Sequence, residues 1–151
     1  MQGKATIEIA ATPEQVYAAV SDLSRMGEFS PECRNVEWLG GATGPAPGAR
    51  FVGYNRSGPV RWSRRGTIVS ADCGREFSFM TEEAGREGTL WTYRLAPAGA
   101  GTSVTESYEV RWIPWWMHIV DAITFRRRQL TRNMSTTLER LKARIESQLA
   151  G

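Results

Sequence analysis

The residue types and the spacing of Glu106 and Tyr108 suit acid–base chemistry. They alternate with Val104 and Val110 in residues 103–112, and a period of two places all four side chains on one face of a β-strand. The valines predict that this face is buried. A carboxylate on a buried face is costly unless it is paired, protonated or in contact with a ligand. We therefore take Glu106 and Tyr108 as the candidate catalytic residues, which would move protons.

An arginine in the C-terminal third is the predicted partner of Glu106. Apolar residues recur over residues 114–149 at spacings of three and four, which predicts one apolar stripe along a single long helix. Continuing that spacing past Ile123 reaches Arg126 or Arg127. We predict an ion pair between Glu106 and Arg127, which either contacts a ligand or only fixes the register of a buried helix.

Aromatic side chains are the other candidates for a binding site. Six of the 151 residues are tryptophan, a rich share, and aromatic walls suit a flat or polycyclic apolar ligand. In residues 89–95, alternation places Trp91 and Tyr93 on one face, and plain core packing is the alternative for most of the aromatic residues. The predicted ligand-binding residues are Trp38, Phe51, Asn55, Trp62, Phe79, Trp91, Tyr93, Glu106, Tyr108, Trp116, Ile123 and Arg127.

Metal and nucleotide chemistry find little support in the residue types. His118 is the single histidine, and the two cysteines, Cys33 and Cys73, are too few for a structural zinc site or a disulfide framework. The glycines of residues 40–44 lack the lysine and the strand-to-helix context of a phosphate-binding loop. We predict no metal site and no cofactor.

The composition predicts one cytoplasmic domain over residues 1–151. The net charge is +3, but the basic residues are scattered and no nucleic-acid-binding motif accompanies them, so we predict no nucleic-acid partner. No stretch approaches the roughly 20 apolar residues that span a bilayer. The start, MQGKATIEIAATPEQ, lacks the apolar region of a secretory signal.

A sheet and a long helix must bring the candidate residues together. Alternation over residues 5–10 predicts an opening strand. Thr12, Pro13 and Gln15 then predict a helix start, because threonine can cap, proline suits the first turn and glutamine completes a capping box. A second short helix or turn is predicted over residues 24–29. Six further strands are predicted over residues 35–39, 49–56, 60–71, 75–81, 89–95 and 103–112.

Four parts of the sequence carry a resemblance to a known family: residues 7–17 (IEIAATPEQVY), residues 47–51 (PGARF) with Asn55 and Arg56 after them, Trp62, and residues 101–108 (GTSVTESY). The chain resembles the START-like (SRPBCC) superfamily, and within it the bacterial polyketide cyclase/dehydrase-like group. The resemblance covers almost the whole chain. It implies the α+β helix-grip fold, in which a curved, seven-stranded antiparallel sheet surrounds a long C-terminal helix, with two short helices after the first strand.

The segment between the last strand and the long helix is unusually apolar. Residues 112–117 read WIPWWM, and so many large groups do not fit inside a thin corner of the domain. Three interpretations stay open: one wall of a pocket mouth, a homodimer contact, or a tip that docks on a membrane beside Arg126, Arg127 and Arg128. We prefer the pocket wall.

Three functions are compatible with these observations. The first is a binding protein that carries or senses a small hydrophobic molecule, such as a lipid or a polyketide or aromatic metabolite, in a cavity between the sheet and the helix. The second is an enzyme similar to the polyketide cyclases and aromatases, which would catalyse intramolecular aldol condensation and dehydration mainly by orienting the chain. The third is a protein-interaction domain. We expect the binding function, with the enzyme as its alternative.

Overall fold

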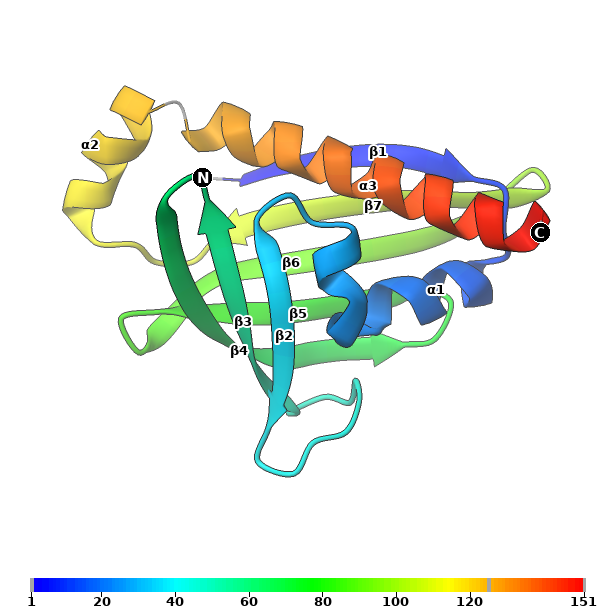
Figure 1. The fold of residues 1–151 in the computed structure, drawn as a ribbon, viewed down its shortest axis with the longest axis horizontal. Coiled ribbons are helices and arrows are strands. Elements are labelled where there is room, and N and C mark those ends of the chain that lie inside the picture. The colour runs from blue at the N-terminus through cyan, green and yellow to red at the C-terminus, as the bar shows by residue number, and fades with distance from the viewer. Residues whose placement is uncertain (1, 125, 151) are drawn as a thin grey trace.

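A computed structural model of the protein describes residues 2–124 and 126–150, without the side chains of residues 121–124. Within these residues one antiparallel sheet of seven strands has the order β1-β7-β6-β5-β4-β3-β2 (Figure 1). Each strand from β2 to β7 pairs with its sequence neighbour, and β1 pairs with β7. The strands are β1 (Gln2–Ile9), β2 (Cys33–Leu39), β3 (Arg50–Ser57), β4 (Val60–Asp72), β5 (Glu76–Glu83), β6 (Arg86–Ala98) and β7 (Gly101–Val110).

The short helix α1 (Pro13–Ser21) begins where the sequence predicts it. The Thr12 hydroxyl accepts a hydrogen bond from the Gln15 backbone N–H (3.1 Å), and the Gln15 side chain accepts one from the Thr12 N–H (2.9 Å). This reciprocal pair satisfies two N–H groups that a helix start would otherwise leave without partners. The 3₁₀ helix η1 (Leu23–Glu28) follows and leads into β2.

The C-terminal third forms two helices where a single one was predicted. They are α2 (Trp115–Thr124) and α3 (Arg126–Ala150), and Figure 1 shows that their axes point in different directions. The prediction of one continuous helix over residues 114–149 was therefore wrong. Apolar residues continue at spacings of three and four through both helices, and such a pattern carries no information about a change in the direction of the axis.

Strong curvature of the sheet makes room for a cavity. In Figure 1, β2 and β3 run across the direction of β1, β6 and β7. The register of β4 against β5 shifts between Ile68 and Ser70. An irregularity of this kind bends a strand and increases its twist. The sheet thus wraps around the helices, and the predicted helix-grip fold is confirmed.

The hydrophobic core occupies one end of this arrangement. Val16 and Val20 of α1 pack there with Leu138, Leu141 and Ile145 of α3 against the inner face of the sheet. The N-terminal half of α3 extends beyond this core, over the opposite end of the sheet (Figure 1). No helix within the described residues is long and apolar enough to cross a membrane.

Candidate functional site

A cavity of about 260 Å³ lies between the sheet and the two C-terminal helices. Strands β2 to β7 supply one wall, α2 with the N-terminal half of α3 supplies the other, and η1 also contributes to the lining. Strand alternation brings aromatic rings and polar groups to the same inner face. Seven of the predicted ligand-binding residues line the cavity: Phe51, Asn55, Trp62, Phe79, Trp91, Tyr93 and Glu106.

Several predicted site residues lie elsewhere. Trp38 is half-buried and packs edge-on against Phe51, but it does not line the cavity. Trp116 is 51% exposed on α2 and does not line the cavity, whereas Ile113 and Met117 of the same apolar segment do. Adjacent positions on a helix differ in direction by about 100°, which separates the side chains of Trp116 and Met117. Ile123 lies among the residues whose side chains the structure does not describe.

Tyr108 shares the inner face with Glu106 but does not line the cavity. Its ring packs against Trp91, with 5.6 Å between the ring centroids, and lies over Gly3 of β1. A Cβ atom at Gly3 would be only 2.7 Å from the Tyr108 ring, so this contact requires a glycine. Tyr108 is thus a packing residue. This corrects the expectation that it faces a ligand.

Tyr93 is the tyrosine that accompanies Glu106. The two residues are directly opposite each other in the pairing of β6 with β7. The Tyr93 hydroxyl donates a hydrogen bond to the Glu106 carboxyl group. Side chains opposite each other on one face of an antiparallel pair lie close enough for such a contact. The sheet register therefore places an acid and a phenol side by side in the cavity wall.

Burial controls the protonation of Glu106. The residue is 4% exposed, and loss of solvation raises the pKa of its carboxyl group to about 8, while the hydrogen bond from Tyr93 acts in the opposite direction. Burial also raises the pKa of Tyr93 well above its ordinary value. At neutral pH, Glu106 is thus mainly an uncharged acid. Such a group can donate a hydrogen bond, and its pKa lies close to the pH at which general acid–base catalysis is effective.

The predicted ion pair between Glu106 and Arg127 does not form. Arg127 is exposed, and its guanidinium group donates a hydrogen bond to the backbone carbonyl of Gln2 (3.3 Å). The neighbouring Arg126 points toward the cavity instead. Because adjacent helix positions differ by about 100°, the extrapolated spacing did not decide between the two arginines. The structure selects Arg126 as the cavity residue.

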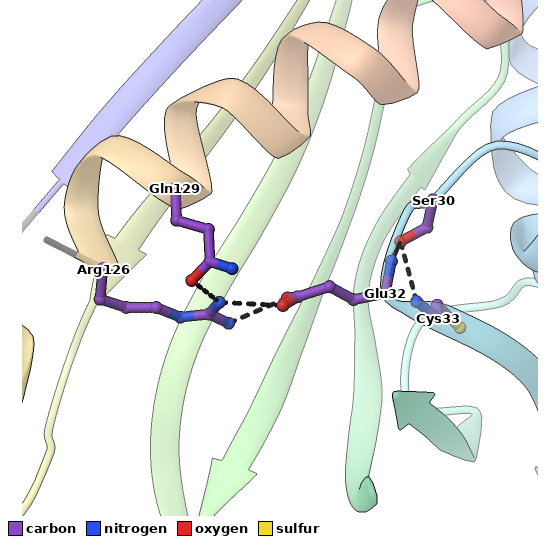
Figure 2. Close-up of polar contacts among 5 residues, drawn as sticks. All are labelled: Ser30, Glu32, Cys33, Arg126 and Gln129. Carbon is purple, nitrogen blue, oxygen red and sulfur yellow. Dashed lines mark hydrogen bonds and ion pairs between the residues drawn. The ribbon is translucent and has the colours of Figure 1, made fainter. Parts of the chain in front are cut away.

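Arg126 forms a two-pronged ion pair with Glu32, shown in Figure 2. Its Nη1 and Nη2 atoms are each 2.9 Å from a different oxygen of the Glu32 carboxylate. Nη1 also donates to the side-chain oxygen of Gln129 (2.8 Å). The Ser30 hydroxyl accepts hydrogen bonds from the backbone N–H groups of Glu32 and Cys33, which fixes the chain before β2. The pair therefore joins the start of α3 to the start of β2.

Ion pairs balance the other charged groups of the cavity lining. Arg64 contacts Glu83 (2.7 Å), and Glu82 pairs with Arg50. Glu106 has no ion pair of this kind within the described residues, and loss of solvation is the dominant influence on its pKa. Glu106 therefore differs from these other ionisable residues of the lining. Burial keeps its carboxyl group uncharged, whereas each of the others is paired with an opposite charge.

Sequence reasoning missed several lining residues on the helices. Asn133 and Thr137 of α3, Met117 of α2 and Ile113 before it all face the cavity. A signal for Asn133 was available, because it is a polar residue next to Met134 in the buried stripe, but its orientation depends on how α3 crosses the sheet. Glu32 gave no comparable signal. Glu32 belongs to the site because it pairs with Arg126, which is distant in the sequence.

Close approach between strands shapes the aromatic wall. Phe51 of β3 is opposite Gly66 of β4, and a Cβ atom at Gly66 would overlap the Phe51 ring. The ring is held edge-on to Phe79, with 5.5 Å between centroids. Phe79 in turn contacts Phe77, which is fully buried. Core and cavity wall thus share one continuous set of rings.

A helix-grip sheet with a cavity beneath its C-terminal helices defines the START-like class of proteins. Within this class, residues 2–146 match the family described as polyketide cyclase / dehydrase and lipid transport, and the chain belongs to that family. A comparison with curated proteins finds no significant match.

Solved structures agree with this assignment. The polyketide cyclase-like protein Cgl2372 from Corynebacterium glutamicum is 30% identical, with a TM-score of 0.67, over 98% of this chain and 93% of that one. The di-domain ARO/CYC protein StfQ from the steffimycin biosynthetic pathway is 15% identical, with a TM-score of 0.78, over 99% of this chain and 52% of its own. The protein TTHA0849 from Thermus thermophilus is 19% identical, with a TM-score of 0.71, over 97% of this chain and 98% of its own. The last two show the fold alone.

Proposed function

We propose that the protein binds a small, largely apolar molecule with a flat or ring-shaped skeleton in its cavity. The observation that carries this proposal is the lining itself. Phe51, Phe79, Trp62 and Trp91 present aromatic surface to a space of about 260 Å³, and its buried acid is neutral at neutral pH. Pockets for drug-sized ligands start near 300 Å³, so a compound of two or three rings is the appropriate size. The family description, which includes both polyketides and lipids, supports this choice.

A cavity-filling variant tests the proposal. Gly53 lines the cavity on β3, and a Cβ atom there would approach no atom of another residue closer than 3.9 Å. Gly53→Leu should therefore fill the cavity without distorting β3. An NMR titration with naphthalene should give saturable shifts at cavity residues in the wild type and lose them in this variant.

Gly44→Leu is the matched control, because Gly44 lies outside the cavity lining and a Cβ atom there meets nothing within 4 Å. The control should bind naphthalene as the wild type does. Binding that survives Gly53→Leu would show that naphthalene sits elsewhere, and the proposal would fail. Native mass spectrometry, followed by extraction of any released compound, would then give the chemical class of the natural ligand.

An enzyme of the cyclase type is the alternative, and the pKa of Glu106 favours it. With a pKa of about 8, the ionised form is accessible near neutral pH. It could take a proton from the carbon between two ketones of a substrate. That carbon would attack a second carbonyl carbon of the same chain, and the proton would return to the alkoxide. Loss of water from this aldol product would form the double bond.

Turnover separates the two functions. Glu106→Gln keeps the shape of the neutral acid but removes the titrating proton. If a poly-β-ketone is cyclised by the wild type, this variant should bind it with similar affinity and lose turnover. Equal turnover in both proteins would exclude Glu106 as the base and leave the binding function.

A further inference from the structure

Two buried polar atoms belong to residues that line the cavity from opposite walls. Glu106 Oε1 belongs to β7, and Asn133 Nδ2 belongs to α3. Both residues line the cavity, and neither atom has a hydrogen-bond partner within residues 2–124 and 126–150. A buried polar group without a partner destabilises the folded state. Two such groups in one cavity point to a bound ligand that supplies the missing hydrogen-bond partners.

The chemistry of the two groups limits what the occupant can be. The Asn133 amide nitrogen is a donor only. Glu106 receives the Tyr93 hydrogen bond, and Oε1, which has no partner, remains free to carry the proton of the neutral acid. A second donor is thus available on the opposite wall. Both donors suit one acceptor atom in the occupant.

The surrounding charges favour an uncharged acceptor. An anion would need a cation in the wall, but both arginines that line the cavity within the described residues, Arg64 and Arg126, are already paired with glutamates. A cation would be repelled by the N–H groups of Asn133. A carbonyl oxygen has two lone pairs and no charge, and it fits both donors.

We propose that Glu106 and Asn133 together form a polar subsite that binds a carbonyl oxygen, so that the preferred ligand is an uncharged ring ketone rather than a hydrocarbon. This inference rests on the proposed binding function and adds to it the group that the ligand must carry. Asn133 is a ligand-binding residue, and it gives the cavity a direction: the ketone end lies between β7 and α3, and the apolar rings lie against the aromatic wall.

A pair of probes with the same carbon skeleton tests the subsite. Tetralin is a two-ring hydrocarbon, and α-tetralone differs from it by one carbonyl group. NMR titrations give the Kd of each probe for the wild type, for Asn133→Leu and for Glu106→Leu. In each variant, the Kd for α-tetralone should rise by about fivefold to tenfold, whereas the Kd for tetralin should change by less than about twofold.

Two further variants complete the experiment. Glu106→Gln keeps a donor at this position and should retain the preference for α-tetralone. Ser135→Leu makes a similar polar-to-apolar change on the exposed side of α3 and should alter neither Kd. The subsite is refuted if tetralin binds the wild type but both leucine variants change the two Kd values equally. If neither probe binds the wild type, the proposed function fails and the subsite fails with it.

Discussion

The surroundings of Glu106 determine both its position and its protonation. Its position opposite Tyr93 follows from the strand register, and its burial raises the pKa to about 8. Sequence alternation was sufficient to predict that the residue faces inward, since Val104 on the same face needed burial. Alternation did not predict its protonation, because that depends on which charges α3 brings to the opposite wall.

The stability of the protein should fall with rising pH because of Glu106. The folded state holds its proton up to about pH 8, whereas the unfolded chain loses it near the ordinary value of 4.5. Between these values the folded state binds one more proton, so a rise in pH lowers the free energy of unfolding by up to about 1.4 kcal/mol per pH unit. Glu106→Gln removes this contribution. Urea unfolding from pH 5 to pH 8 should therefore show the variant gaining stability relative to the wild type.

Glu139→Gln is a suitable control for that measurement, since Glu139 is exposed on α3. Other titrating groups act equally in the wild type and the variants, so they cancel in the difference. A difference between wild type and Glu106→Gln that stays constant across this range would contradict the raised pKa.

The ion pair between Arg126 and Glu32 is the contact that links two elements across the cavity. Its side chains are 28% and 15% exposed, so solvent weakens it. It nevertheless has two short hydrogen bonds and a fixed backbone on the Glu32 side. The start of α3 is thereby held against the start of β2.

Arg126→Met should lower the free energy of unfolding by only about 1 kcal/mol, because the pair is partly exposed. Its larger effect should be local. Hydrogen exchange should become faster at the amides of Glu32 and Cys33 while the amides of β6 remain protected. Arg140→Met, an equivalent change at an exposed position of the same helix, should leave exchange near β2 unchanged. Equal exchange in the two variants would show that the pair does not hold this segment.

At the level of the whole molecule, local patterns predicted the fold well and the site less completely. The strands and α1 follow from alternation, capping and turns, which act between near neighbours in the chain. Asn133 and the pairing of Arg126 with Glu32 depend on how α3 crosses the sheet. Whether Arg126 or Arg127 faces the cavity depends on a shift of one position along the helix. Such contacts join distant segments, and spacing within one segment does not determine them.

The exposed tryptophans of α2 give a prediction about the state of the molecule in solution. Trp115 is 76% exposed and Trp116 is 51% exposed. Changing Trp115 to serine should alter the free energy of unfolding by less than about 0.5 kcal/mol, because most of its side chain is already in contact with water. The homodimer expected as one alternative from the sequence stays a prediction. Sedimentation of the wild type and of Trp115→Ser and Trp116→Ser decides it, since a dimer built on α2 should dissociate in both variants.

The pairing of β1 with β7 has a consequence for how the chain is made. While the ribosome extends the chain, each strand from β3 to β7 can join the strand synthesised just before it. Among these seven strands, β1 is made first, yet its partner β7 is made last. Contacts between such distant segments form slowly, and unpaired strand edges promote aggregation. Newly made chains should therefore be most exposed to aggregation in the interval before β7 and α3 appear.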